Sequence, residues 1–181
     1  MASWELIDSE ILESDGTSME VNFDSAINFA DVQSFAIYFS ASLDVPPAVP
    51  HSQDCAMRIG TGGSVISSGN YEAYGIVIQD GGQALLNSSY GESSWRTENS
   101  NGGGTFIGLM YLTMNPLTDF PHMVMTVATD NRTITAGRSQ YMMSCGGFLN
   151  STLTSLQNIT LSSSNNLLEE SRIYVYKVLN S

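Results

Sequence analysis

Apolar and polar side chains alternate with a period of two along most of this 181-residue chain, and this alternation restricts its fold more than any other feature. In the segment SFAIYFSASL, residues 34–43, Phe35, Ile37 and Phe39 share one face of an extended strand. In the segment SRIYVYKV, residues 171–178, aliphatic residues alternate with tyrosines. A period of two with one apolar face is typical of antiparallel strands that lie on a core.

About ten segments carry this pattern, and none shows the 3.6-residue period of a long helix. Turn residues between them, such as Asp15-Gly16 and Asp130-Asn131-Arg132, predict tight reversals, and residues 24–32 predict one helical turn. Because no repeat or composition break divides the chain, we predict one all-β domain over residues 1–181, an antiparallel sandwich or barrel. The expected strands are 4–12, 17–23, 34–43, 55–61, 71–79, 105–114, 122–130, 133–145, 153–163 and 171–178.

The charge balance restricts the partners. Charged residues make up 13% of the chain, and 18 acids against six bases give a net charge of -12. The five arginines are scattered, whereas nucleic-acid binding needs clustered cations, so we expect neither nucleic acid nor an anionic membrane as partner. The opening MASWELIDSE has no basic start and no apolar run of leader length, and no run of about 18 apolar residues follows. We therefore expect a chain made in the cytoplasm without a signal peptide.

Residues that could carry chemistry are sparse. His51 and His122 are far apart in sequence, and no metal-ligand spacing, phosphate-binding loop or nucleophile elbow is present, so we expect no metal, no cofactor and no catalytic residues. The carboxylate pairs Glu13/Asp15 and Glu169/Glu170 fall in expected turns and are interpreted as solvated turn residues rather than a glycosidase pair. Cys55 and Cys145 are expected as partly buried thiols, although a disulfide between them stays open.

Two aromatic residues lie in the longest polar stretch, residues 87–104. Tyr90 and Trp95 are surrounded there by Ser, Asn and Gly, where a ring has no obvious place in the core. Either the rings stack on a sugar or anchor a protein–protein contact, or they fold back over the edge of the sandwich. The sequence alone favours neither interpretation, so Tyr90 and Trp95 are the candidate interaction aromatics.

The C-terminal segment LQNITLSSSNNLLEESRIYVYKV, residues 156–178, resembles the end of a group of virion proteins of tailed bacteriophages. In that group an apolar strand, a Ser/Asn/Gly hairpin and a Ser-Arg-apolar-x-apolar-Tyr strand close the chain. Here Ile159 and Leu161 match the first strand, residues 163–166 the hairpin, and residues 171–176 the last strand. The segment INFADVQSFAIYFSASL, residues 27–43, resembles the front half of that group more loosely.

This resemblance implies a jelly-roll-like β-sandwich on the virion surface, as a capsid decoration (cement) protein, a head fibre or a tail appendage, without catalytic residues. We expect a decoration protein that binds the outside of the phage head and stabilises contacts between major capsid protein subunits. Its partners would be the major capsid protein and further copies of itself, as a homodimer or homotrimer. The alternative is a receptor- or carbohydrate-binding module of a tail or fibre, with Tyr90 and Trp95 as stacking platforms for a glycan.

Overall fold

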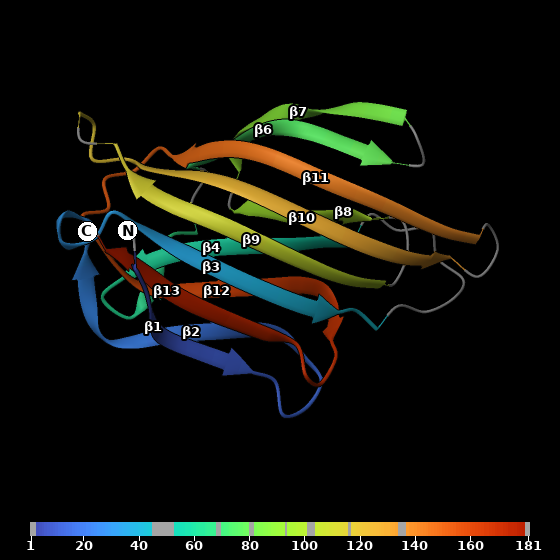
Figure 1. Cartoon of the computed structure of the whole chain (residues 1–181), viewed down its shortest axis with the longest axis horizontal. Coiled ribbons are helices and arrows are strands. Elements are labelled where there is room, and N and C mark those ends of the chain that lie inside the picture. The colour runs from blue at the N-terminus through green and yellow to red at the C-terminus, as the bar shows by residue number, and fades with distance from the viewer. Residues whose placement is uncertain are drawn as a thin grey trace.

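The computed structural model describes residues 3–44, 53–67, 70–79, 82–92, 94–100, 104–115, 117–133 and 137–179. For some of these residues it describes the position in a strand but not the side chain. They are residues 53, 54, 77–79, 82–92, 96–100, 104, 129–133 and 137–141. These residues form two antiparallel sheets, which lie one in front of the other in Figure 1. The predicted all-β, jelly-roll-like sandwich is confirmed.

The larger sheet, sheet A, has eight strands. Their order across the sheet is β1 (Ser3–Ile11), β13 (Arg172–Leu179), β3 (Ser34–Ser42), β9 (Gly104–Met114), β10 (Pro121–Thr133), β11 (Gly137–Leu149), β6 (Tyr71–Gln79) and β7 (Gly82–Glu92). The closing strand β13 is thus an interior strand between β1 and β3, and β1 forms the edge (Figure 1).

The smaller sheet, sheet B, has five strands. It contains β2 (Gly16–Asn28), β12 (Ser155–Leu167), β4 (Gln53–Thr61) and β5 (Ser64–Val65) in that order, and β8 (Trp95–Ser100) pairs with β4. The chain crosses between the sheets repeatedly, because β1, β3, β6 and β13 belong to sheet A whereas β2, β4, β8 and β12 belong to sheet B. Each crossing lets the alternating apolar residues of successive strands face the same layer between the sheets.

The core is that layer, and the strand registers show how the alternation fills it. One inward row of sheet A runs from Val175 through Ile37, Met110 and Met125 to Cys145, and all five side chains are buried. In sheet B the inward rows have three members each, all buried: Met19, Leu161 and Met57 in one row, and Val21, Ile159 and Ile59 in the next. Burial of these rows removes apolar surface from water and is the main stabilising term.

Two local predictions were wrong, and a third, the helical turn within residues 24–32, was confirmed in a shorter form. Asp130, Asn131 and Arg132 do not form a turn but continue β10, where they pair with residues 138–140 of β11. The polar stretch 87–104 is largely strand, since it contains the end of β7 and all of β8. The helical turn is a three-residue 3-10 helix, η1 (Phe29–Asp31), while β2 runs on to Asn28. In the described residues thirteen strands therefore replace the expected ten or so, and four of them are 13 residues long.

Candidate interaction surface

The face of sheet A that points away from the core, here called the outer face, is predominantly apolar. Its residues form continuous rows across seven strands, because each strand pair keeps its register. The central row is Leu6, Tyr176, Ala36, Tyr111, Val124, Gly146 and Tyr74. The next row is Ser9, Tyr174, Tyr38, Leu109, Thr126, Ser144 and Ile76, and the row beyond it runs Ile11, Arg172, Ser40, Ile107, Ala128 and Met142. Arg172 is the one charged residue in these three rows.

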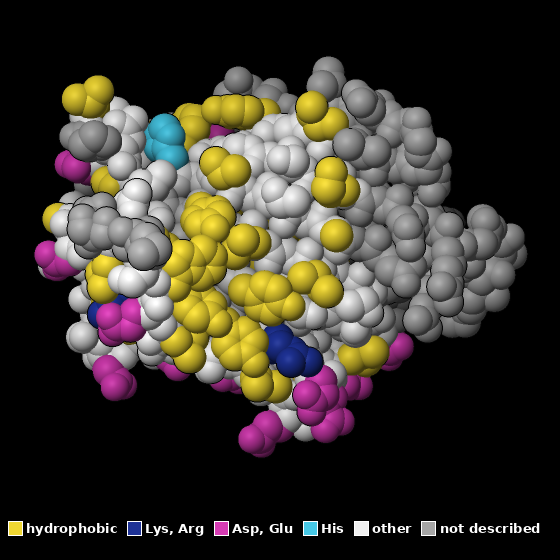
Figure 2. All heavy atoms as spheres, in the orientation of Figure 1, with side chains coloured by type: hydrophobic (Ala, Val, Ile, Leu, Met, Phe, Trp, Pro, Cys, Tyr) yellow, Lys and Arg dark blue, Asp and Glu magenta, His cyan; other side chains and the backbone are white. Residues whose placement is uncertain are grey.

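Several large apolar side chains of this face are strongly exposed. Val124 is 59% exposed and Ile107 47%, although an interior strand of a monomer normally buries such groups on one side or the other. Leu6, on the edge strand β1, is 51% exposed. Figure 2 shows the result as a yellow band along the middle of the face, with magenta acidic side chains mainly along its lower and left margins. Contiguous exposed apolar surface of this kind marks a binding site more often than a free surface.

Aromatic rings gather at one end of the outer face. The Trp4 ring lies across β13 and β3, with its centroid 5.8 Å from that of Tyr111 and 5.7 Å from that of Tyr176. Tyr38 and Tyr174 form a second pair at 6.1 Å. Ring contacts of this geometry hold the side chains in place, so they present a pre-organised surface to a partner.

The opposite surface of the sandwich has a different character. On the outer side of sheet B, Glu20, Thr160 and Arg58 form one row, and Ser18, Ser162 and Ala56 form another. A strand row with hydroxyls and charges is suited to water. The molecule therefore has one polar face and one apolar, aromatic face.

The structure places Trp95 in the core, which excludes it as an exposed platform. Its side chain is completely buried, and its indole N–H donates a 3.2 Å hydrogen bond to the carbonyl oxygen of Glu72. Because Trp95 pairs with Met57, it belongs to an inward row of sheet B, and its ring packs edge-on against Tyr71 at 5.0 Å. Of the two interpretations of the polar stretch, packing is the correct one for Trp95. Tyr90 lies in β7, and its side chain is outside the described residues.

Tyr71 links the two sheets through its hydroxyl group. The residue opens β6 in sheet A, yet its hydroxyl accepts a 3.0 Å hydrogen bond from the Ile59 N–H in sheet B. The same hydroxyl lies 2.9 Å from the carbonyl oxygen of Ile66 and 3.2 Å from that of Ile59, to either of which it can donate. Burial raises the pKa of Tyr71 to about 12. The phenol therefore serves as a neutral bridge between the sheets.

The cysteines and His122 do not build a common metal site in the part of the chain that the structure describes. Cys55 and Cys145 are both buried thiols, as expected, and burial raises the pKa of Cys145 to about 11. His122 stacks on Phe148 with ring centroids 5.7 Å apart, whereas His51 is outside the described residues. Within the described ranges no three His, Cys, Asp or Glu side chains come together as a metal site. No helix in that part of the chain is long and apolar enough to cross a membrane.

The two carboxylate pairs occupy exposed turns at one end of the sandwich. The Asp15 carboxylate accepts a 2.9 Å hydrogen bond from the backbone N–H of Glu169, and the Glu170 N–H donates to the Leu12 carbonyl oxygen. Asp15 thus holds the β12–β13 turn against the β1–β2 turn. This contact joins residues 154 positions apart, which the sequence alone did not reveal.

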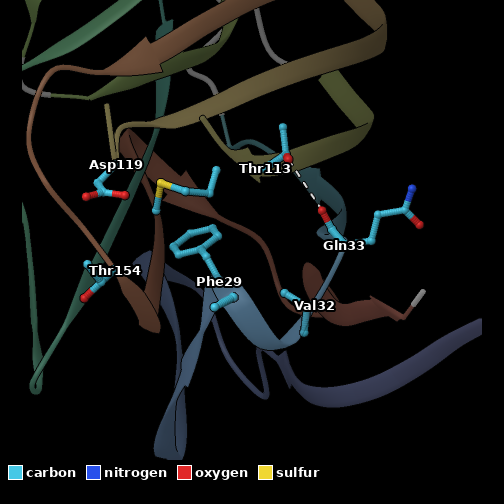
Figure 3. Close-up of a pocket in the computed structure, with 8 residues that line it drawn as sticks. Phe29, Val32, Gln33, Thr113, Asp119 and Thr154 are labelled. Atoms are coloured by element: carbon cyan, nitrogen blue, oxygen red, sulfur yellow. Dashed lines mark hydrogen bonds between the residues drawn. The ribbon is translucent and has the colours of Figure 1, made fainter. Parts of the chain in front are cut away.

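A pocket of about 410 Å³ opens beside η1 and the turn between β9 and β10 (Figure 3). Phe29, Val32 and Met114 supply apolar lining, and Thr113, Gln33, Asp119 and Thr154 add polar groups. The Thr113 hydroxyl donates to the Gln33 carbonyl oxygen at 3.4 Å, and the Leu153 N–H donates to the Asp119 carbonyl oxygen at 3.3 Å. The pocket combines one exposed carboxylate with hydroxyls and an amide, so its lining suits a neutral or cationic group better than an anion.

Sequence reasoning missed the outer face, although the sequence contains a signal for it. In the segment TFIGLMYLTM, residues 105–114, apolar residues occupy both parities, with Ile107 and Tyr111 on one and Met110 and Leu112 on the other. Strands that are apolar on both faces are typical of sheets covered on both sides. Since sheet B covers only one side of β9, the second apolar set remains exposed.

Comparisons with known proteins give little information on family. The sequence matches no family model and no curated protein. Among solved structures, the botulinum neurotoxin serotype D binding domain is similar over 98% of this chain and 43% of that chain, with 12% identity and a TM-score of 0.32. The receptor binding domain of the botulinum neurotoxin mosaic serotype C/D is similar over 99% and 43%, with 13% identity and a TM-score of 0.31. The chain thus spans less than half the length of either.

Proposed function

We propose that this protein is a non-catalytic capsid decoration protein of a virion, which acts through protein–protein contacts made by the outer face of sheet A. The observation that carries the proposal is the exposed apolar and aromatic surface across β1, β13, β3, β9, β10, β11 and β6. Interface cores are poor in charge and rich in Tyr, Trp and Met, as this surface is. The resemblance of residues 156–178 to virion proteins of tailed bacteriophages supports a place on the virion surface, of which the capsid is the one we propose.

The mechanism is stabilisation by mass action. A protein that binds only the assembled shell lowers the free energy of that state relative to every disassembled one. A charge-poor, pre-organised face loses little conformational entropy on binding, because the rings of Trp4, Tyr111 and Tyr176 already contact one another. The major capsid protein is the partner expected for such a decoration protein.

The test locates the protein on purified virions and then removes it. Gold-labelled antibodies against the chain should mark heads, and heads that lack the protein should break at lower temperature until purified protein is added back. Val124→Asp, which puts a charge in the centre of the outer face, should fail to restore heat resistance. Label confined to the tail tip, or unchanged head stability after add-back, would refute the proposal.

A second candidate, glycan binding, is favoured by the exposed ring cluster of Trp4, Tyr111 and Tyr176. Sugars stack on such ring faces, and this cluster replaces the buried Trp95 as the possible platform. Wild-type protein and the Trp4→Ala variant should then differ on a glycan array. If wild type binds no glycan, this candidate is rejected and the decoration proposal is unaffected.

A further inference from the structure

The outer face is large enough to form a stable interface by itself. Neighbouring strands lie ~4.8 Å apart and alternate residues along a strand ~6.8 Å apart. The three rows described above and the row of His122, Phe148 and Glu72 beside the central row therefore span, over seven strands, roughly 30 Å by 20 Å, or roughly 600 Å² in projection. A standard interface buries ~800 Å² of accessible surface per partner, and a corrugated surface exceeds its projection. The face thus has the dimensions of one half of a dimer interface.

The charge distribution favours a second copy as the occupant. The chain has a net charge of -12, yet the three rows that begin at Leu6, Ser9 and Ile11 contain no acid. Two copies packed through this face keep their acidic margins at the rim, and the surface that they bury carries no charged side chain except Arg172 and Glu72 near its corners. A strongly basic partner would instead be attracted to the acidic surfaces elsewhere, so charge complementarity points away from it.

The two charged residues nearest the corners of the face are opposite in sign. Arg172 lies on β13 in the row of Ile107. Glu72 lies on β6, paired with Phe148, one row beyond the central row on the other side. These positions are diagonally opposite, with β3, β9, β10 and β11 between them. Within the described residues neither side chain has an ion-pair partner.

This arrangement is self-complementary under two-fold symmetry. In a two-fold dimer the same patch serves both copies, so a contact between two positions occurs twice. An axis along the other diagonal of the face brings Arg172 of each copy over Glu72 of the partner subunit. Because that diagonal runs at about 45° to the strands, the strands of the two sheets cross at nearly a right angle, which is one of the two common sheet packings.

We propose that a second copy of this chain covers the outer face and forms a two-fold dimer, with Arg172 and Glu72 as reciprocal partners. This dimer rests on the proposed function and assigns the protein–protein contact of the outer face to a second copy, so that the surfaces left exposed on the two copies contact the shell. The dimer would present the same exposed surfaces to the shell twice, once from each copy. Two linked attachment points bind more tightly than either alone, since the second contact is intramolecular. A dimer of this kind could bridge two capsid subunits.

The first test measures self-association by sedimentation velocity and native mass spectrometry. Wild type should be a dimer at micromolar concentration, and Val124→Asp should weaken the dimer at least ~100-fold, because the new charge would be buried without a partner. The matched control is Leu117→Asp, which changes a 92% exposed residue on the turn after β9, away from the outer face, and should leave the dimer intact. Circular dichroism establishes that both variants are folded.

The second test reverses the charges. Arg172→Glu and Glu72→Arg should each weaken the dimer about tenfold, and the double variant should restore it. A monomeric wild type, a dimer that survives Val124→Asp, or a double variant that shows no rescue would overturn the proposed dimer. If wild type is monomeric but Val124→Asp still abolishes binding to heads, the outer face binds the shell directly and the decoration proposal stands. If the dimer forms but heads are not bound, the dimer proposal stands and the decoration proposal is refuted.

Discussion

Substitution of Tyr71 by Phe tests how the two sheets are held together. The change removes one oxygen and leaves the ring and its edge contact with Trp95 in place. Two hydrogen bonds are lost, one from the Ile59 N–H at 3.0 Å and one to a carbonyl oxygen at 2.9 Å. The Ile59 carbonyl oxygen still accepts from the Ile66 N–H, so the unsatisfied group of greatest cost is the buried Ile59 N–H.

The expected loss of stability follows from that count. An unsatisfied buried donor costs about 1–3 kcal/mol, and we expect Tyr71→Phe to lower the free energy of unfolding by about 2 kcal/mol. In a chain of this length that corresponds to a fall in Tm of roughly 4–8 °C. Urea unfolding followed by tryptophan fluorescence measures the free energy, and calorimetry measures Tm. The control is Tyr174→Phe on the outer face, for which we expect a change below about 0.5 kcal/mol. Equal effects of the two substitutions would show that the hydroxyl bridge contributes nothing.

Two further predictions concern the core. The folded state raises the pKa of Cys145 to about 11 and that of Tyr71 to about 12, so it holds both protons more tightly than the unfolded chain does. The contributions of both groups to the free energy of unfolding are complete below about pH 9. They are lost as pH rises toward about 12, by up to ~1.4 kcal/mol per pH unit for each group. Urea unfolding midpoints that stay constant from pH 9 to pH 11 would contradict this prediction. A side chain at Gly108 would overlap the Phe39 ring, so Gly108→Ala should lower the free energy of unfolding by about 1–3 kcal/mol. A Cβ atom at Gly146 meets no atom closer than 3.8 Å, so Gly146→Ala should leave thermal unfolding nearly unchanged.

The sequence predicts the fold class well because burial imposes it directly. Phe35, Ile37 and Phe39 must share a face in any extended strand, and the structure buries all three completely. The ends of elements were less predictable. Asp130 to Arg132 have the composition of a turn, but pairing with β11 keeps them in the strand, since cross-strand contacts override local preference.

The candidate site was harder to predict, and for a physical reason. The polar neighbours of Trp95 left open whether its ring is exposed or packed, whereas pairing with Met57 across two strands distant in sequence places it in the core. The outer face depends on the same kind of non-local information. Val124 and Tyr111 become neighbours only through the register of β9 and β10, and no local pattern indicates which of two apolar faces remains uncovered.

A reconstruction of the intact virion by electron cryomicroscopy tests the central claim most directly, because it shows both where the protein lies and what covers its surface. We expect density for the sandwich on the outside of the head, with Trp4, Tyr111 and Val124 buried against protein. Density in which these residues face solvent, or a sandwich found only on the tail, would contradict it.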